Sequence, residues 1–263
     1  MLLIFRKGII EGLFLFKIIF LFFFSLLSSN VLFSQNFLKT AGRNIINQNG
    51  DTIVLRGIGL GGWMVQEGYM MAPGGFSGTQ FQIRDKITDL IGEEETEKFY
   101  NKWLNNHVRK IDIDSMKSWG FNLVRVPIHY NLFTAPIEDE LFPGSYTEIE
   151  KGYKLLDSLL EWCKANEMYM MIDLHAAPGG QGYNADISDY DTSKYSLWES
   201  GANQDKTVEL WKRLSQRYKN EEWVAGYDLI NEPNWNLPGN KLLKELYVRI
   251  TDVIRAEGDE HIL

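Results

Sequence analysis

Short apolar segments alternate with longer amphipathic segments after residue 36, and this alternation limits the fold more than any other sequence feature. The short segments have the length of strands, whereas the long segments repeat their apolar residues with the period of a helix. The predicted strands cover residues 56–60, 121–126, 168–174 and 224–230. Strands that alternate with helices form parallel sheets built from βαβ units. The sequence therefore predicts an α/β fold.

The segments between these strands read as helices. The predicted helices cover residues 94–108, 112–119, 151–166, 206–218 and 241–256. Two further signals frame this series: Asn49-Gly50 predicts a hairpin between residues 45–47 and 52–55, and residues 261–263 read as the start of another strand. Pro127 is expected to stop the second predicted strand.

Each predicted strand ends in polar or glycine residues. These ends lie at residues 59–62, 125–127, 173–175 and 231–233. A doubly wound sheet concentrates its chemistry at one switch point, whereas a (β/α)8 barrel collects catalytic residues from several strand ends. Because polar or glycine residues end all four strands, the sequence favours the N-terminal half of a (β/α)8 TIM barrel, with about four βα units plus an N-terminal hairpin. This barrel is incomplete, because a closed barrel needs eight units.

Residues 1–35 have the order of a secretory signal, with basic Arg6 and Lys7, an apolar stretch at 18–27 and a polar exit. The alternative is an uncleaved membrane anchor, but an apolar core of about ten residues is short of the ~20 that span a bilayer. We therefore expect a signal peptide at 1–35 and an exported domain at 36–263, secreted, periplasmic or at the cell surface. No stable membrane partner is expected after cleavage.

Charge and cysteine content exclude several classes of function. The formal net charge is −8, which opposes binding of nucleic acid through its phosphates. The single cysteine, Cys163, rules out an internal disulfide and a cysteine metal cluster. The sequence carries no Walker loop, and its G-x-G-x-x-G match at 57–62 begins inside a predicted strand and not after one, so no nucleotide cofactor is expected.

The strongest chemical signal is Glu232, which directly follows an apolar strand inside the segment 227–235. A carboxyl at a barrel mouth can be desolvated enough for its pKa to rise, so that it acts as an acid. Arg125 and His175 end two other strands, and Asp173 precedes His175 on the same side of its strand, where it is expected to orient the ring. Each of these residues alone has a structural explanation: Glu232 in a turn, Arg125 in an ion pair and His175 as a core histidine. Together they favour an active site.

Four motifs in order resemble glycoside hydrolase family 5, the cellulase family. They are Gly-Ile-Gly-Leu-Gly-Gly-Trp at 57–63, Phe-Asn-Leu-Val-Arg-Val-Pro at 121–127, Asp-Leu-His-Ala-Ala-Pro-Gly at 173–179 and Ile-Asn-Glu-Pro at 230–233. The Gly-Gly-Trp followed by Glu67 is similar to the branch that contains exo-β-1,3-glucanases. The resemblance implies a (β/α)8 barrel and retaining hydrolysis of β-linked glucans or mannans without a cofactor or metal.

The resemblance also implies a role for individual residues. Glu232 matches the general acid/base, and Asn231 matches the neighbour that hydrogen-bonds the sugar 2-hydroxyl. Arg125 matches the arginine that keeps the nucleophile ionised, His175 a histidine that contacts sugar hydroxyls, and Glu67 an acid that binds the terminal sugar. The family's nucleophile is a second glutamate on a seventh strand, which we expect to lie outside this sequence.

Aromatic side chains gather in and around the segment 176–203, which predicts a long loop. Because sugar rings stack on aromatic faces, we expect a subsite wall here; the expected substrate-binding aromatics are Trp63, Tyr183, Trp198 and Trp235. Two alternatives stay open: these rings only pack the loop, or the aspartates within 186–191 bind calcium.

The sequence thus predicts an exported retaining glycoside hydrolase that cleaves β-glucosidic bonds in a glucan polysaccharide or oligosaccharide. The β-1,3, β-1,4 and β-1,6 linkages and endo or exo action all stay open. The first alternative is a non-catalytic glucan-binding remnant of such an enzyme, and the second is a sugar-binding or structural protein that shares the strand ends by chance.

Overall fold

Four parallel strands form the central sheet in the computed structural model, which describes residues 37–71 and 78–263. They are β3 (Gly57–Gly59), β4 (Leu123–His129), β5 (Tyr169–Ala176) and β6 (Val224–Asp228), hydrogen-bonded in chain order. Because every neighbouring pair is parallel, the carboxyl ends of all four strands lie at one edge of the sheet. The predicted strands fall on these elements, which confirms the βα order.

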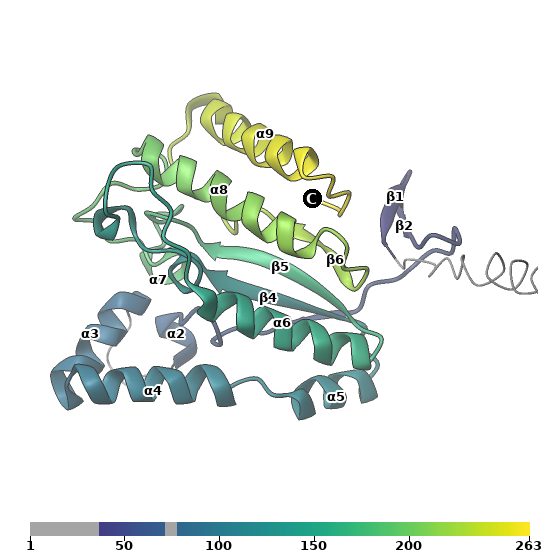
Figure 1. Cartoon of the computed structure of the whole chain (residues 1–263), viewed down its shortest axis with the longest axis horizontal. Helices are drawn as coiled ribbons and strands as arrows, with labels where there is room; N and C mark the ends of the chain where they lie inside the picture. The colour runs from purple at the N-terminus through teal and green to yellow at the C-terminus, as the bar shows by residue number, and fades with distance from the viewer. Residues whose placement is uncertain (1–36, 72–77) are drawn as a thin grey trace, which may run out of the picture. The chain divides into compact units, whose positions relative to one another are not determined.

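Helices connect the strands and follow one another along the sheet, as Figure 1 shows for α5, α6, α8 and α9. The helices are α2 (Gly68–Met71), α3 (Gln80–Ile91), α4 (Glu93–Asn106), α5 (Lys110–Ser118), α6 (Glu150–Ala165), α7 (Ala185–Ser188), α8 (Gly201–Tyr218) and α9 (Lys241–Ala256), with short 3-10 turns at Tyr130–Leu132, Ile137–Asp139 and Pro238–Asn240. The five predicted helices are confirmed as α4, α5, α6, α8 and α9. The sequence reading missed α3.

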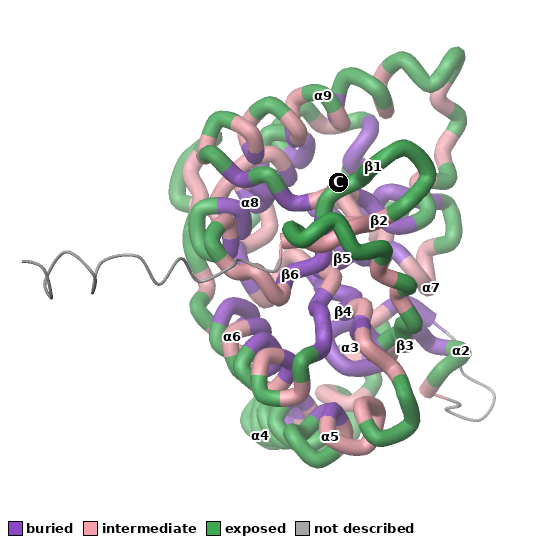
Figure 2. Tube along the Cα trace, turned by 90° about the vertical axis from the view of Figure 1, so that its right-hand side faces the viewer, coloured by how far each residue is buried: buried purple, intermediate pink, exposed green. Residues whose placement is uncertain are grey.

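The main core lies between the sheet and these helices. In α6, every apolar residue at helical spacing from Tyr153 to Cys163 is buried against strands β4 and β5, together with residues of α8 and α9. Figure 2 shows the same pattern, with β4, β5 and β6 largely buried and the outer turns of the helices exposed. Helical periodicity in the sequence therefore located the face that packs on the sheet.

A small antiparallel sheet accompanies the amino end of the strands. It joins β1 (Lys39–Ala41) to β2 (Asn44–Ile46), and Leu38 is buried in a second apolar cluster with Leu123, Tyr169 and Ala225. The predicted hairpin at Asn49-Gly50 is only partly correct. The Asn47 side chain accepts bonds from the backbone N–H groups of residues 49 and 51 and so forms the turn, but residues 52–55 form a single bridge, because the chain then leaves for β3.

The prediction that Pro127 stops its strand is wrong. Strand β4 continues through Pro127 to His129. The carbonyl of Arg125 accepts a bond from the N–H of Leu60, so residues 125 and 127 turn their backbone groups toward β3. Because β3 already ends at Gly59, the missing N–H of Pro127 costs the ladder no hydrogen bond.

The predicted strand start near the last residue is confirmed as a parallel bridge between Gly226 and Ile262. A Cβ at Gly226 would lie 2.5 Å from the Ile262 carbonyl oxygen, so this close approach requires glycine. Within the described residues the sheet does not close into a barrel.

The predicted secretory leader at 1–35 lies outside the described residues. None of the helices among the described residues combines the length and apolar character needed to cross a membrane.

Candidate active site

The carboxyl edge of the sheet collects the polar residues that the sequence analysis singled out. Glu67 follows β3, Arg125 lies in β4, His175 lies near the end of β5, and Asn231 and Glu232 follow β6. The parallel arrangement of the strands therefore places residues more than 160 positions apart in the sequence at one edge (Glu67 to Glu232). This edge is where (β/α)8 enzymes carry their active sites.

His175 lies between two carboxylates. Its Nδ1 is 2.7 Å from Asp173 Oδ2, and its Nε2 is 3.2 Å from Glu67 Oε1. The expectation that Asp173 orients His175 is confirmed by this contact. Burial alone would lower the pKa of His175, but the hydrogen bonds to Asp173 and Glu67 raise it to about 9. The imidazole is therefore a cation at neutral pH, with an N–H directed at each carboxylate.

Arg125 joins three strands through its guanidinium. Its Nη2 lies 2.9 Å from Asp228 Oδ2 and 3.0 Å from Asp173 Oδ2, and it donates a 2.8 Å bond to Asn231 Oδ1. Burial raises the pKa of Asp173, while His175 and Arg125 act in the opposite direction. The guanidinium therefore already carries two carboxylate partners on this chain.

Asn231 is held at the centre of this network. Its backbone N–H donates to the Leu174 carbonyl, and its Nδ2 lies 3.4 Å from His175 Nε2. The buried Gln181 side chain donates to the carbonyls of both His175 and Asn231. Gln181 thus links the loops after β5 and β6. Together with the bond from Arg125 to Asn231 Oδ1, this link fixes the direction of the Asn231 side chain.

Glu232 follows Asn231 with a φ of +42°, a left-handed backbone conformation that is rare outside glycine. Its side chain is exposed, and no hydrogen bond or ion pair reaches its carboxylate from the described part of the chain. The expectation of a desolvated carboxyl is therefore not met within these residues, because none of the described elements covers it. Strained backbone of this kind persists where the surrounding structure holds it.

Two of the expected sugar-binding tryptophans are buried. Trp63 is 2% exposed and donates its indole N–H to the Leu104 carbonyl. Trp198 is 6% exposed and donates to the Gln181 carbonyl. The placement of Trp63 as a sugar platform is corrected here: its ring packs in the core because the turn after β3 folds it under α4. Trp198 only borders a hollow of about 300 Å³ that Trp235 also lines.

Tyr183 and Trp235 do form an aromatic platform. Their rings stack with centroids 4.1 Å apart and an interplanar angle of 10°, and Tyr190 meets Trp235 edge to face at 5.3 Å. Tyr183 is 56% exposed. This arrangement agrees with the expected aromatic wall beside the strand ends.

The aspartates of segment 186–191 do not converge. Asp189 accepts from the Phe81 N–H and contacts His129, whereas Asp191 accepts from Ser193. Among the described residues there is no group of three or more His, Cys, Asp or Glu side chains that could hold a metal ion. The calcium alternative therefore has no support in the described residues.

Sequence reasoning missed two members of the network. Asp228 was read only as part of a strand, although it ends β6 two residues after Gly226, at the position where a side chain faces Arg125. Gln181 lies in a long predicted loop, and without a helical or strand period the sequence does not indicate that its side chain is buried. The signal that could have found Asp228 is its charge at the end of an otherwise apolar strand.

Comparisons with known proteins bear on the family and the fold of the chain. The family model Cellulase (glycosyl hydrolase family 5) matches residues 78–263. A β-xylosidase of Phanerodontia chrysosporium is 36% identical over 228 residues, which cover 86% of this chain and 45% of that protein. A probable glucan 1,3-β-glucosidase A of Aspergillus clavatus is 28% identical, covering 77% of this chain and 47% of that protein. The chain thus spans about half the length of the curated relatives it matches.

Solved structures share the fold. The rutinosidase from Aspergillus niger superposes with a TM-score of 0.55 at 18% identity, over 77% of this chain and 57% of that one. An endogalactoceramidase superposes with a TM-score of 0.52 at 17% identity, over 86% of this chain and 51% of that one. With the parallel four-stranded sheet, these matches confirm the prediction of a partial (β/α)8 barrel.

Proposed function

This chain belongs to glycosyl hydrolase family 5, a family of O-glycosyl hydrolases, and from that premise we propose that it forms part of an exported retaining hydrolase of β-glucosidic bonds in glucans. The observation that carries the proposal is the network directly beside Glu232, in which Arg125 holds the Asn231 side chain and Gln181 links the carbonyls of His175 and Asn231. A free carboxyl at this place can protonate a glycosidic oxygen, and the fixed amide beside it can hold a sugar hydroxyl.

Glu232 is assigned the role of general acid/base. Its carboxyl is open to a bound substrate, while its backbone is held by the adjoining Asn231, whose N–H and side chain are both bonded. Because Arg125 occupies Asn231 Oδ1, the Asn231 Nδ2 group is left to donate to a sugar hydroxyl. The acid/base and its positioning amide therefore come from one rigid turn.

A retaining mechanism needs a second carboxyl about 5–5.5 Å from the first. Asp173 and Asp228 are both engaged by Arg125, and Glu67 is engaged by His175. We therefore propose that the nucleophile is a glutamate outside residues 1–263. The length of the curated relatives, about twice that of this chain, supports the same proposal.

Sugar binding is assigned to two features of the edge. Glu67 offers its second carboxylate oxygen as an acceptor for sugar hydroxyls, in a position fixed by the cationic His175, and the Tyr183–Trp235 stack offers an apolar face for a sugar ring. The relatives named β-xylosidase and glucan 1,3-β-glucosidase favour a β-linked neutral sugar. Export rests on the order of residues 1–35, basic, then apolar, then polar.

The test uses two proteins: this chain alone and the longer polypeptide that we propose contains it. We expect the longer protein to hydrolyse β-glucan and to release a product of retained anomeric configuration, measured by proton NMR. The chain alone should bind oligosaccharide without turnover. Inversion of configuration would overturn the retaining mechanism, and hydrolysis of xylosides but not glucans would overturn the substrate. Binding without turnover by the longer protein would favour the non-catalytic alternative.

A further inference from the structure

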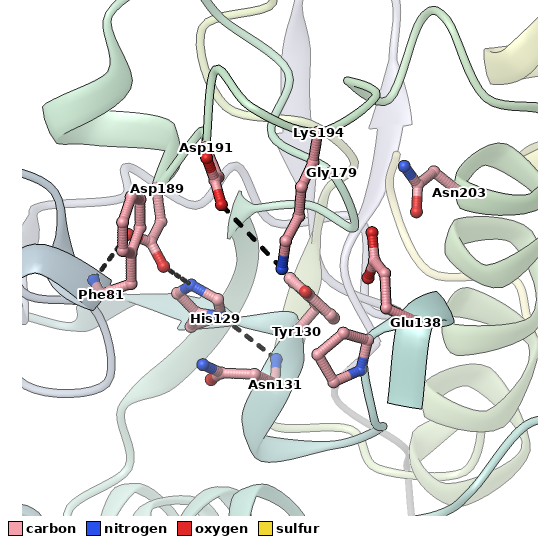
Figure 3. Close-up of a pocket in the computed structure, with 11 residues that line it drawn as sticks. Phe81, His129, Tyr130, Asn131, Glu138, Gly179, Asp189, Asp191, Lys194 and Asn203 are labelled. Carbon is pink, nitrogen blue, oxygen red and sulfur yellow. Dashed lines mark hydrogen bonds and ion pairs between the residues drawn. The ribbon is translucent and has the colours of Figure 1, made fainter. Parts of the chain in front are cut away.

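A second pocket lies beyond the end of β4, apart from the network around Asn231. It has a volume of about 200 Å³, and its lining includes His129, Tyr130, Glu138, Asp189 and Lys194. Figure 3 shows these side chains converging from the end of β4, the turn that follows it and the loop after β5. The first two of these segments join β4 to α6, so the pocket lies between two βα connections at the edge that carries the candidate active site.

The inner wall of this pocket is fixed. Asp189 Oδ1 accepts from the Phe81 N–H at 2.9 Å, and its Oδ2 lies 2.8 Å from His129 Nε2. His129 Nδ1 accepts from the backbone N–H of Asn131, so Nε2 carries the proton that is donated to Asp189. Every polar atom of these two side chains is therefore used to hold three segments together, and the pocket is preformed.

Other lining groups keep unused hydrogen-bonding capacity. The Lys194 ammonium points toward the middle of the lining residues in Figure 3, and its side-chain partner among the described residues is Asp191 at 4.0 Å, beyond hydrogen-bonding distance. The Glu138 carboxylate and the Asn131 amide receive no side-chain hydrogen bond from the described part of the chain. The pocket thus offers a ligand both hydrogen-bond donors and an acceptor.

The charge of the pocket selects among ligands. Three carboxylates, Glu138, Asp189 and Asp191, face one ammonium group, so a phosphate or an acidic sugar is disfavoured. A neutral polyhydroxyl compound fits, because each hydroxyl both donates to a carboxylate and accepts from an ammonium or amide N–H. Pro136 and Tyr130 add apolar surface for the C–H face of a sugar ring.

We propose that this pocket is a second saccharide-binding subsite, which takes one neutral hexose or pentose unit through Lys194, Glu138 and Asn131. His129 lies four residues beyond Arg125 on β4, roughly 13 Å at about 3.3 Å per residue, so the pocket is separate from the candidate active site. The subsite deepens the proposed function, on which the choice of saccharide rests. The subsite binds one sugar unit of a saccharide at a distance from the scissile bond, which lies at Glu232.

The experiment is an amide NMR titration of the purified chain with laminaribiose and, separately, xylobiose. We expect saturable shifts at residues 131 and 189–195. Lys194→Met and Glu138→Gln should each raise the dissociation constant for these shifts about tenfold and leave any shifts at residues 231–232 unchanged. Lys244→Met, at an exposed position of α9, is the matched control. Both tested side chains are exposed, so folding should survive, which the melting temperature checks.

Each result decides the proposal. Saturable pocket shifts that weaken in Lys194→Met and Glu138→Gln but not in Lys244→Met support the subsite, even if the longer polypeptide proves inactive on glucans. The absence of saturable shifts at residues 131 and 189–195, or a dissociation constant unchanged by both substitutions, overturns it. In that case, hydrolysis of glucan by the longer polypeptide would still support the proposed function.

Discussion

His175 Nε2 lies 3.2 Å from Glu67 Oε1, although 108 residues separate them in the sequence. The contact joins the turn after β3 to the end of β5 across the intervening strand β4, and Asp173 holds the other ring nitrogen. A cation shared by two carboxylates, both nearly buried, fixes the position of Glu67. The part of the edge assigned to sugar binding is therefore preorganised before any sugar binds.

This relationship makes stability depend on pH. The pKa of His175 is raised to about 9 in the folded chain, against about 6.5 in an unfolded chain. The stabilisation is therefore complete below about pH 6.5 and is lost as the pH rises through about 9. We expect His175→Gln to be less stable than the wild type at pH 6, with the difference shrinking by pH 10, measured by urea unfolding.

His107→Gln is the control for this series, because His107 is exposed and has no carboxylate partner among the described residues. Its unfolding free energy should track that of the wild type across the same pH range. A constant difference between wild type and His175→Gln from pH 6 to 10 would contradict the paired cation.

Substitution of the buried Trp63 should mainly lower stability, whereas substitution of the exposed Tyr183 should mainly weaken sugar binding. Trp63→Ala removes a side chain that is 2% exposed and a buried hydrogen bond, so it should cost about 3–5 kcal/mol of unfolding free energy. Tyr183→Ala removes an exposed ring and should cost less than about 1.5 kcal/mol, the upper range of an aromatic pair, while weakening oligosaccharide binding. Chemical denaturation and a binding titration separate these effects; equal stability losses would contradict the assignment.

A buried ion pair joins the loop before α6 to helix α8. Lys206 and Glu140 form it with side chains only 3% exposed, and Lys206 also contacts Thr134 Oγ1 and the Tyr146 ring. Lys206→Met leaves a buried carboxylate unpaired and should cost about 3–5 kcal/mol. Adding Glu140→Gln removes the stranded charge and should restore part of that loss.

An exposed ion pair provides the comparison for Lys206. Lys98 contacts Glu94 and Glu95 on the surface of α4, so Lys98→Met should change the unfolding free energy by less than about 1 kcal/mol. Equal losses for Lys206→Met and Lys98→Met would show that burial of the first pair has no energetic consequence.

Periodicity and strand ends predicted much of this structure. Helix α9 begins and ends at the predicted residues, Lys241 and Ala256, because its apolar spacing is strong and Asn240 and Gly258 flank it. Helix α3 was missed, although Thr79 and Gln82 form a capping box that is readable in the sequence. The order of the strands followed from the βα pattern alone.

Side-chain direction was the harder part. Trp63 follows a strand end, as catalytic residues do, but a single turn of backbone decides whether its ring faces solvent or α4, and no local pattern records that choice. Gln181 and Asp228 act through partners 50 and 103 residues away. Such contacts become visible only when the strands are placed side by side.

The central claim is that Glu232 protonates the glycosidic oxygen, and rate measurements on the proposed longer polypeptide test it directly. Glu232→Gln should reduce hydrolysis of unactivated β-glucan by roughly 10²- to 10⁴-fold, and glycosylation by a dinitrophenyl β-glucoside much less, because that leaving group needs little protonation. Glu161→Gln, whose exposed side chain lies on α6, should behave as the wild type. A near-normal rate on β-glucan, or equal losses on both substrates, would contradict the assignment.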